Sequence, residues 1–583
     1  MLLKKNNKNK KIANNKMKPE IKKVVKKWAL DNARKYKGKA NQGAVISKII
    51  NEIPEIKTKL KEIMPEIAGI IKEVNSLGIE KQIKELEKIA PELLEEKKKT
   101  EEKKLKPLPK AVKGKVVTRM APSPSGPLHI GHAFVLSLNS EYAKKYDGKL
   151  ILRIEDTNPE NIYPPAYEMI EQDAKWLTQN KIAKIEIQSS RLEKYYAYAE
   201  TLIKKGQAYV CKCDPDKFRK LIQAKKACKC RNLDPKEHEK RWKKMFKEYK
   251  PGEAILRIKT DLENPNPALR DWPAMRINTH KHPKTGTKYK VWPLMNFSVV
   301  CDDHDLGITH SIRGKDHMTN EERQKQVRRL FGWKDPVALF FGRINFKGIK
   351  LSSTETRKKI EYGEYEGWDD IRLHTIRALK RRGYQPEAFI KFAIDMGLSL
   401  TDKTVDKKEF YKILNSHNKE IIEPKANRYF FVWDPVEVAI NKAPSKKVEL
   451  ALHPDFPKRG KRILNFDRVV LITKDDFKRI EQGKLYRLMD CWNFTRKNGK
   501  LTYHSGDIET YRKKGAGIFH WLPIEEKTVN VEVLMPDNKL IKGVGESGIS
   551  KLKIGDIVQL ERFGFCRLDS IKKGVYKFWY THR

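Results

Sequence analysis

Runs of β type and runs of helical type alternate along the middle of the chain, and this alternation constrains the fold more than any other feature. Residues 116–120 and 150–154 are short apolar runs that predict strands, whereas the segment from His129 and residues 167–177 predict helices. Strands that alternate with helices are typical of a parallel, doubly wound sheet whose ligands lie beyond the carboxyl ends of the strands. We therefore predict a multidomain protein built around an α/β, Rossmann-like domain.

On either side of this domain the sequence changes character. Before it, apolar residues such as Ile63, Ile67 and Ile71 recur at helical spacing. After it, short alternating runs are separated by turn signals such as Asn498-Gly499, which is typical of β-barrels. We predict these segments in chain order: a disordered basic tail (1–17), a helical domain (18–104), a linker (105–114), the first half of the Rossmann domain (115–210), an insertion (211–271), the second half (272–367), a helical region (368–427) and all-β barrels (428–583).

The formal net charge of +48 indicates a polyanionic partner. Lysine and arginine side chains that neutralise phosphates supply most of the non-specific affinity for nucleic acid. Lysine-rich codon usage is the alternative explanation, and the two are compatible. The sequence has no apolar run near the roughly 18 residues that a membrane-spanning helix needs, and no apolar signal-peptide stretch at its N-terminus. We expect a cytoplasmic protein that binds nucleic acid and no membrane.

Four of the seven cysteines are clustered in the predicted insertion. They form two C-x-C pairs separated by fourteen residues, a spacing at which four thiolates can close a tetrahedral zinc site. Reduced, unligated thiols are the alternative. His238 is a spare ligand but reads as a surface histidine. We predict a structural Zn²⁺ site made by Cys211, Cys213, Cys228 and Cys230.

The segment of residues 119–132 reads RMAPSPSGPLHIGH and joins the first predicted strand to its helix. The amino end of a helix is a favourable site for an anion, because its N–H groups are unpaired and its dipole is positive there. Gly131 lets a flat group approach the backbone closely. His129 and His132 can each offer a donor to phosphate oxygens, although an isolated HxxH would more often be incidental.

This string resembles the HIGH signature of class I aminoacyl-tRNA synthetases. Its flank, APSPSG, is similar to that of glutamyl-tRNA synthetases, whereas the glutaminyl enzymes usually carry a PPEPNG-like flank. The resemblance runs from about residue 18 to the C-terminus and is weakest over the helical domain. It is to the archaeal and eukaryotic branch, because the C-terminal part resembles anticodon-binding β-barrels and bacterial glutamyl enzymes carry a helical domain instead.

The resemblance implies a glutamate site at the ends of the predicted strands. Glu155, in the run LRIEDTN, resembles the acceptor for the substrate ammonium group. Arg119 and Arg313 resemble the arginines that face the substrate, and Ser123 in the flank is expected to line the same site. Surface ion pairs are the alternative for each charged residue. Met295 stands where many relatives have a tyrosine that lines the amino-acid pocket. The choice of amino acid on that side of the pocket therefore does not follow from the family.

Residues 346–354, FKGIKLSST, resemble the KMSKS loop that closes over ATP. Lys350 fits the first lysine and Ser352 the serine, but Ser353 occupies the position of the second lysine. The resemblance therefore implies that ATP is bound by His129, Gly131, His132, Lys350 and Ser352, with His129, His132 and Lys350 catalytic. The sequence leaves open which cation replaces the missing lysine among Arg357, Lys358 and Lys359.

The implied activity is the ATP- and Mg²⁺-dependent activation of L-glutamate and its transfer to the 3′-terminal adenosine of tRNA(Glu), with tRNA(Gln) as a second candidate acceptor. The resemblance also implies a monomer, an insertion that binds the tRNA acceptor end, a region at 368–427 that contacts the tRNA stem, and barrels that bind the anticodon. Candidate tRNA contacts in the barrels are Arg428, Arg487 and Arg496.

Three alternatives remain. A glutaminyl-tRNA synthetase shares the fold and the chemistry, and the APSPSG flank argues against it. A tRNA-binding homologue that has lost catalysis would explain Ser353. Glutamylation of a modified tRNA base is disfavoured, because enzymes of that kind lack anticodon barrels.

Overall fold

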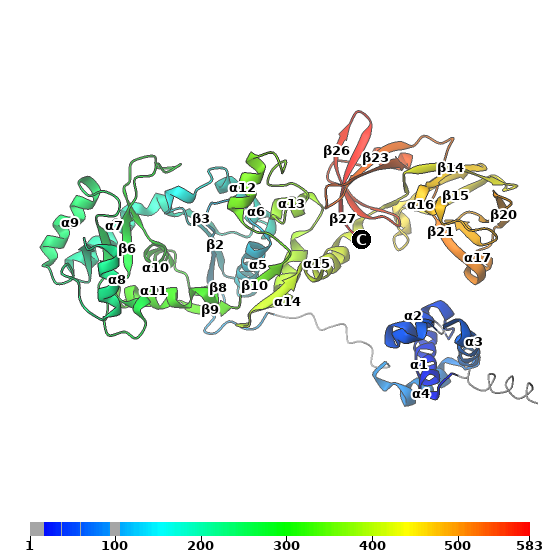
Figure 1. Ribbon diagram of the computed structural model, residues 1–583, viewed down its shortest axis with the longest axis horizontal. Coiled ribbons are helices and arrows are strands. Elements are labelled where there is room, and N and C mark those ends of the chain that lie inside the picture. Colours follow the sequence, from blue (N-terminus) through cyan, green and yellow to red (C-terminus); the bar gives the residue numbers. More distant parts are fainter. Residues whose placement is uncertain (1–16, 37, 59, 94–104) are drawn as a thin grey trace, which may run out of the picture. The chain divides into compact units, whose positions relative to one another are not determined.

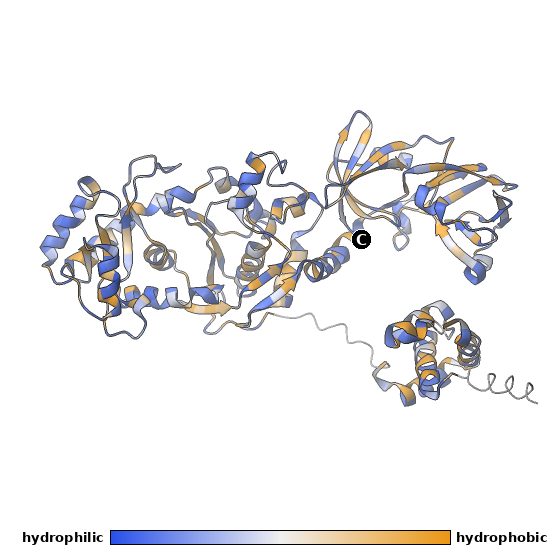
Figure 2. Ribbon diagram, in the orientation of Figure 1, coloured by the Kyte–Doolittle hydropathy of each residue, from blue (hydrophilic) through white to orange (hydrophobic). Residues whose placement is uncertain are grey.

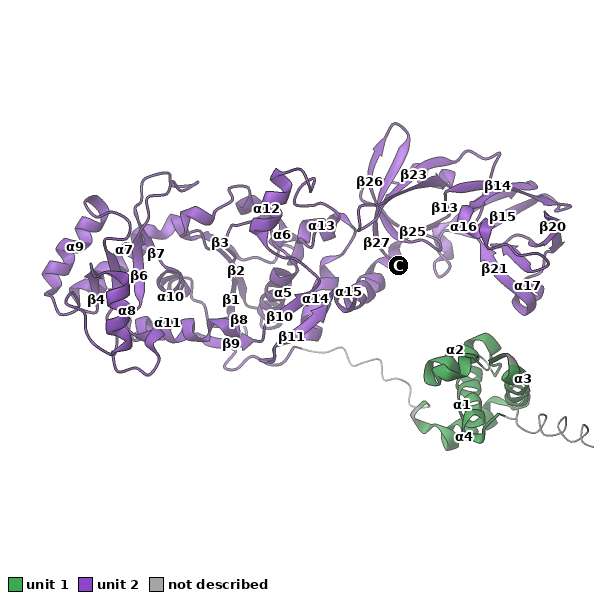
Figure 3. Cartoon of the chain, in the orientation of Figure 1, with its two compact units in different colours: residues 1–104 green, residues 105–583 purple. Residues whose placement is uncertain are grey.

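The computed structural model describes residues 17–36, 38–58, 60–93 and 105–583. The chain forms two compact units, residues 1–104 and 105–583, and each is described here by itself (Figure 3). The predicted basic tail lies outside the described residues except for Met17, which is buried in the core of the first unit. No helix in the described part of the chain is both long and apolar enough to span a bilayer.

The first unit is helical, as its periodicity predicts. Polar and apolar residues are interspersed along each helix (Figure 2), and the apolar ones meet in one core that includes Val25, Ile49 and Ile67. Asn41 caps the second helix by accepting a hydrogen bond from the amide of Ala44 (3.1 Å). The helices are α1 (Pro19–Lys35), α2 (Gln42–Glu52), α3 (Leu60–Ser76) and α4 (Ile79–Ile89).

Parallel strands form the centre of the second unit, and the two predicted strands are confirmed (Figure 1). β1, β2 and β3 make one parallel sheet, and β8 and β9 pair in parallel beside it. The amide of Thr309 donates to the carbonyl oxygen of Val117 (3.1 Å), which places β8 next to β1. The strands are β1 (Val117–Met120), β2 (Lys149–Ile154), β3 (Lys184–Ile187), β8 (His310–Gly314) and β9 (Val337–Phe341), and the helices that pack with them include α5 (Ile130–Lys145) and α6 (Ala166–Leu177).

The predicted linker packs onto this domain. Leu108 is buried, its amide donates to the hydroxyl of Tyr146 (2.8 Å), and His310 Nε2 lies 3.0 Å from the carbonyl oxygen of Pro109. Residues 105–114 therefore pack against the α/β domain.

An antiparallel sheet of order β4-β5-β6-β7 begins just before the predicted insertion (211–271) and extends past its end. Its core includes Trp242 and Met245, which lie on the buried face of a helix whose other face is basic. The elements are β4 (Ala208–Cys211), α8 (Pro215–Gln223), α9 (Pro235–Lys247), β5 (Ile255–Ile258), β6 (Pro273–Ile277) and β7 (Val291–Pro293), with α7 (Leu192–Lys204), α10 (Met295–Asp305) and α11 (Met318–Phe331) around them.

Helices dominate the next region, which also has one parallel pair of short strands, the first at its start and the second before its last helix. These elements are β10 (Ile344–Lys347), α12 (Ser353–Glu361), α13 (Ile376–Arg381), α14 (Pro386–Met396), β11 (Lys403–Asp406) and α15 (Lys407–Ile422).

The C-terminal part is β-rich, as predicted. Its first seven-stranded sheet has the order β12-β25-β26-β27-β23-β24-β13. Because β12 and β13 are separated in the chain only by Phe430, the two edges of this sheet come close to closing a barrel. The strands are β12 (Arg428–Tyr429), β13 (Phe431–Trp433), β23 (Val529–Leu534), β24 (Leu540–Gly545), β25 (Ile557–Leu560), β26 (Gly564–Lys572) and β27 (Val575–His582).

A second seven-stranded sheet has the order β21-β18-β19-β20-β14-β17-β22, with the hairpin β15–β16 beside it. Its apolar core includes Trp521 and Phe494. The strands are β14 (Pro435–Asn441), β15 (Lys446–Ala451), β16 (Lys461–Phe466), β17 (Val469–Thr473), β18 (Leu485–Leu488), β19 (Asn493–Lys497), β20 (Lys500–Ser505), β21 (Gly515–Phe519) and β22 (Leu522–Pro523).

Candidate active site

The two histidines of the HIGH-like string lie at the amino end of α5, which follows β1. His129 is the N-cap, and its Nδ1 accepts a hydrogen bond from the amide of Gly131 (3.1 Å). His132 Nδ1 accepts from the amide of His129 (3.4 Å), and the two rings stack with centroids 3.8 Å apart. Since both Nδ1 atoms are acceptors, the proton of each neutral ring is on Nε2, which leaves an N–H donor.

Burial keeps both rings neutral. It lowers the pKa of His132 to about 4, and burial, with the stacked His132 ring as a second cause, holds the pKa of His129 well below its usual range. The N–H groups of α5 add a positive end of a helix dipole beside them. Donors and a positive helix end of this kind are suited to an anion such as a phosphate.

The flank of the motif is closely packed. A Cβ atom at Gly126 would lie 3.0 Å from the Trp368 ring and 3.1 Å from Ser353, the first residue of α12. The flank and the KMSKS-like loop are therefore in direct contact at this point. Ser123 of the flank is exposed.

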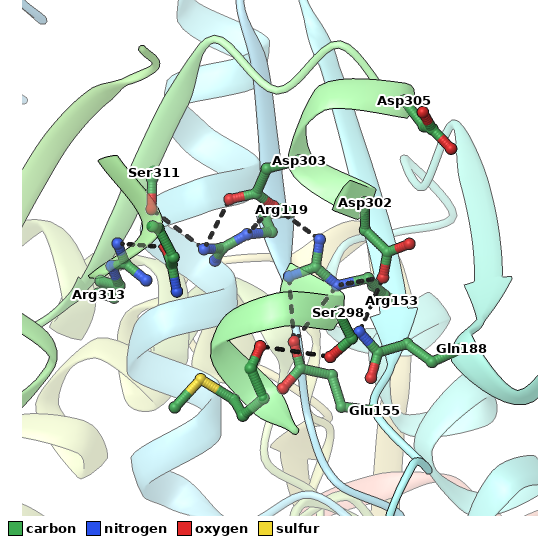
Figure 4. Close-up of polar contacts among 12 residues, drawn as sticks. Arg119, Arg153, Glu155, Gln188, Ser298, Asp302, Asp303, Asp305, Ser311 and Arg313 are labelled. Carbon is green, nitrogen blue, oxygen red and sulfur yellow. Dashed lines mark hydrogen bonds and ion pairs between the residues drawn. The ribbon is translucent and has the colours of Figure 1, made fainter. Parts of the chain in front are cut away.

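The residues predicted to bind glutamate lie at the ends of neighbouring parallel strands (Figure 4). Arg119 is near the end of β1, and Glu155 follows β2. Arg313 is in β8, where Nη2 donates to Gln324 Oε1 (3.0 Å) and also bonds Glu321. Burial and the charge of Arg119 lower the pKa of Arg313 to about 10, so the guanidinium stays charged.

Sequence reasoning missed a set of buried charges behind these residues. Asp303 binds both Arg119 and Arg153, and Glu155 Oε1 accepts from Arg153 Nη2 (3.0 Å). Burial raises the pKa of Glu155, and the charge of Arg153 opposes that shift. The one local sign of these charges in the sequence is Arg153 itself. It is the only charged residue among the last five residues of β2, and all five are buried. Its acidic partner from α10 has no such signal, because the contact spans 150 residues of sequence.

The cations of the KMSKS-like loop and of α12 pair with nearby carboxylates or are exposed, unlike the buried arginines of the glutamate site. Lys350 has an 82% exposed side chain and pairs with Glu355 (3.1 Å), so its amine is not at the histidines in this conformation. Ser352 caps α12 by accepting from the amide of Glu355 (3.2 Å). Among the cations that follow, Lys358 is exposed and Lys359 pairs with Glu364 (2.8 Å).

Arg357 lies on another face of α12. Its guanidinium carbon is 5.8 Å from the ring of Tyr163, and its Nε is buried with no hydrogen-bond partner in the described structure. The amide of Tyr163 donates to the carbonyl oxygen of Pro124 (2.8 Å), which belongs to the motif's flank. Of the three cations left open by the sequence, Arg357 is therefore the one seen to contact a residue that bonds the motif's flank, and its Nε also lies 3.7 Å from Glu361 Oε1.

The four clustered cysteines lie at the end of β4 and in the loop between α8 and α9. Their sulfur atoms are within 4.8 Å of one another, with Cys211–Cys228 at 4.0 Å and Cys213–Cys230 at 3.8 Å. A tetrahedral site with Zn–S bonds of about 2.3 Å has an S–S edge of about 3.8 Å, so the four sulfur atoms fit this metal. The hydrogen bond from Cys211 lowers the pKa of Cys228 to about 5. The structure corrects the expectation for His238, which is buried, because its Nδ1 accepts from a backbone amide of β4 (3.3 Å).

The arginines predicted to contact tRNA have intramolecular partners. Arg487 is buried, and its Nη1 donates to Asn493 Oδ1 (2.9 Å) across the β18–β19 pair. A buried guanidinium that bonds its own sheet is placed to stabilise the sheet. Arg496 Nη1 donates to the carbonyl oxygen of Ile480 (3.3 Å), and Arg428 is partly buried.

Three family models match this chain in succession. The model "tRNA synthetases class I (E and Q), catalytic domain" matches residues 115–422. Two models described as "tRNA synthetases class I (E and Q), anti-codon binding domain" match residues 426–513 and 518–569.

Curated relatives named "Glutamate--tRNA ligase" match almost the whole chain. That of Methanothermobacter thermautotrophicus is 46% identical over 96% of this chain and 99% of its own length. That of Thermococcus kodakarensis is 47% identical over 97% of this chain and all of its own length, and that of Methanocaldococcus jannaschii is 43% identical over 95% and 99%. The chain therefore belongs to the class I tRNA synthetase family for glutamate and glutamine, as a glutamate–tRNA ligase of the archaeal type.

Proposed function

We propose that this protein activates L-glutamate with ATP and transfers it to the 3′-terminal adenosine of tRNA(Glu). The observation that carries the proposal is the juxtaposition of two sites at the carboxyl ends of one set of parallel strands. One is the pair of neutral histidines at the start of α5, and the other is the pair of guanidiniums of Arg119 and Arg313 beside Glu155. A phosphate chain fits the first and an amino acid with a second carboxylate fits the second.

In the first step a carboxylate oxygen of glutamate attacks the α-phosphorus of ATP. A bond forms between the carboxylate oxygen and the α-phosphorus. The bond between the α-phosphorus and the bridging oxygen breaks, and pyrophosphate departs with that oxygen. The Nε2–H groups of His129 and His132 donate to phosphate oxygens, and ATP enters as its Mg²⁺ complex, which adds charge neutralisation. Lys350 leaves Glu355 as the loop closes, with Ser352 and Gly131 lining the same site.

We place Arg357 at the phosphates in the role of the missing second lysine. Its position beside Tyr163, and a buried Nε that makes no hydrogen bond and lies 3.7 Å from Glu361 Oε1, support this assignment over the exposed Lys358. In the second step a ribose hydroxyl of the terminal adenosine attacks the mixed anhydride, and AMP leaves. No protein nucleophile takes part in this chemistry.

Charge complementarity selects glutamate over glutamine in this proposal. Arg119 and Arg313 face the side-chain carboxylate, which accepts charge-assisted hydrogen bonds from both guanidiniums, whereas a neutral amide offers one oxygen and no charge. Glu155 Oε1 is held by Arg153, so Oε2 is the atom that accepts from the substrate ammonium group. Ser123 and Met295, which is 36% exposed at the start of α10, complete the wall of the pocket.

The remaining regions hold the tRNA. The four cysteines bind Zn²⁺ as a closed structural site that braces residues 211–271 against the acceptor end, residues 368–427 contact the stem, and the β-rich domains bind the anticodon. Arg428 and Arg496 remain candidates for these contacts. The protein acts as a monomer in the cytoplasm, and tRNA(Gln) is a second acceptor to be tested.

Activation is tested by ATP–pyrophosphate exchange in the presence of tRNA. Exchange should require glutamate, and His129→Ala should slow it by about 100-fold, because it removes a donor to the reacting phosphates. Arg357→Ala should slow exchange, whereas the matched Lys358→Ala should not. Exchange with glutamine alone would indicate a glutaminyl enzyme, and tight tRNA binding without exchange would indicate a homologue that has lost catalysis.

A further inference from the structure

Two adjacent carboxylates near the end of α10 accept hydrogen bonds from different partners (Figure 4). Asp302 accepts from Arg191 Nε (2.6 Å), Gln188 Nε2 (2.7 Å) and the hydroxyl of Tyr195 (2.8 Å). These three partners come from the segment that follows β3 and from α7. Asp302 therefore ties α10 to the surrounding structure.

Asp303 turns toward the glutamate site instead. Its Oδ1 accepts from Arg119 Nε (2.8 Å) and from Arg153 Nη1 (2.6 Å), and its Oδ2 lies 3.3 Å from Arg119 Nη2. Ser311 Oγ accepts from Arg119 Nη2 as well (3.1 Å). All of these side chains are buried.

The orientation of Arg119 follows from these contacts. A guanidinium is planar, so a carboxylate that holds Nε and Nη2 fixes the direction of Nη1. Within residues 105–583, the hydrogen bonds of the Arg119 side chain use Nε and Nη2, so Nη1 is available to an anion.

Through Arg153, the Asp303 carboxylate also contacts the part of the site that contains Glu155. Arg153 Nη1 binds Asp303, while Arg153 Nη2 and Nε bind Glu155 Oε1 at 3.0 and 3.3 Å. Arg153 is fully buried, so Asp303 and Glu155 supply the charges nearest to its guanidinium, with Asp302 at 3.7 Å from Nε. Burial opposes the ionisation of Asp303, but the charges of Arg119 and Arg153 outweigh it and hold the pKa of Asp303 well below its usual range.

We propose that Asp303 is a positioning residue for glutamate, which orients Arg119 toward the side-chain carboxylate and, through Arg153, orients Glu155 toward the ammonium group. This inference rests on the proposed function. Asp303 itself does not touch the substrate. Its effect is to fix the distance between the two groups that hold the ends of the amino acid.

The test is Asp303→Asn in the full-length protein, with Asp302→Asn as the matched control. The two substitutions are adjacent, equally conservative and equally buried, so both should lower the melting temperature. Asp303→Asn should raise KM for glutamate by about 10- to 100-fold, the range expected for loss of a charged hydrogen bond, with KM for ATP changed less than about twofold. Asp302→Asn should change KM for glutamate by less than about threefold.

Ser311→Ala gives a second and milder test, because it removes one contact to Arg119 without removing a charge. It should raise KM for glutamate by about threefold and leave KM for ATP unchanged. If Asp303→Asn does not fold, a change in KM for glutamate alone in Ser311→Ala supports the inference, and no change overturns it.

Equal effects of the two aspartate substitutions on both KM values would overturn the inference and leave Asp303 a structural residue. If the wild type catalyses exchange with glutamate and Asp303→Asn has an unchanged KM for glutamate, the inference is overturned and the proposed function stands. Wild-type protein that exchanges with no amino acid would contradict the proposed function itself.

Discussion

At the scale of single residues, the neutral state of the paired histidines determines what they can do. The sequence predicts two donors at a helix terminus, but it does not say which nitrogen carries the proton. That follows from the two backbone amides that bond Nδ1, a consequence of the N-cap geometry of His129. Both rings are therefore neutral Nε2–H donors, as the proposed phosphate contacts require.

The lowered pKa of His132 predicts a pH dependence of stability. A histidine in the unfolded chain has a pKa near 6.5, and that of His132 in the folded protein is about 4. As pH falls below about 6.5, the unfolded chain binds a proton that the folded protein does not, so stability is lost as pH falls. Between pH 7 and pH 5 this group should remove about 2 kcal/mol from the free energy of unfolding.

Urea unfolding at both pH values checks this. The His132→Gln variant lacks the titrating group, so it should lose about 2 kcal/mol less than the wild type between pH 7 and pH 5. Equal losses in the two proteins would show that His132 is not held neutral by burial.

At the scale of elements, the positions of strands and helices could be predicted from local patterns in the sequence, whereas contacts between distant segments could not. The strands at 116–120 and 150–154 and the helix from His129 follow from apolar periodicity and are confirmed. The partner Asp303 of Arg119 could not be predicted, because it lies 184 residues away and only the folded chain brings the two side chains together. The strand order of the two C-terminal sheets is equally non-local.

The cysteine cluster gives a prediction at this scale. Wild-type protein should contain about one Zn²⁺ per chain by atomic emission, and Cys228→Ser should contain far less, since a thiolate ligand is lost. Cys301→Ser, which changes a buried cysteine of α10 outside the cluster, should keep its zinc. Chelation should speed amide exchange in α8 and the loop before α9, while β1 and β2 stay protected. Equal zinc content in all three proteins would place the metal elsewhere.

At the scale of the whole molecule, every residue assigned to the two reaction steps lies in the unit of residues 105–583. The net charge of +48 is spread over the chain and suits a large polyanion, and the two β-rich domains match anticodon-binding families. The sequence supplied the order of these regions. It could not supply the near-closure of the sheet that begins and ends with β12 and β13.

Aminoacylation of tRNA with labelled glutamate and, separately, labelled glutamine tests most directly that this protein joins glutamate to tRNA. Purified tRNA(Glu) and tRNA(Gln) are used as separate acceptors. We predict that tRNA(Glu) accepts glutamate, that neither tRNA accepts glutamine, and that His129→Ala slows charging by about 100-fold. Charging with glutamine in place of glutamate would contradict the assignment of Arg119 and Arg313 to a substrate carboxylate.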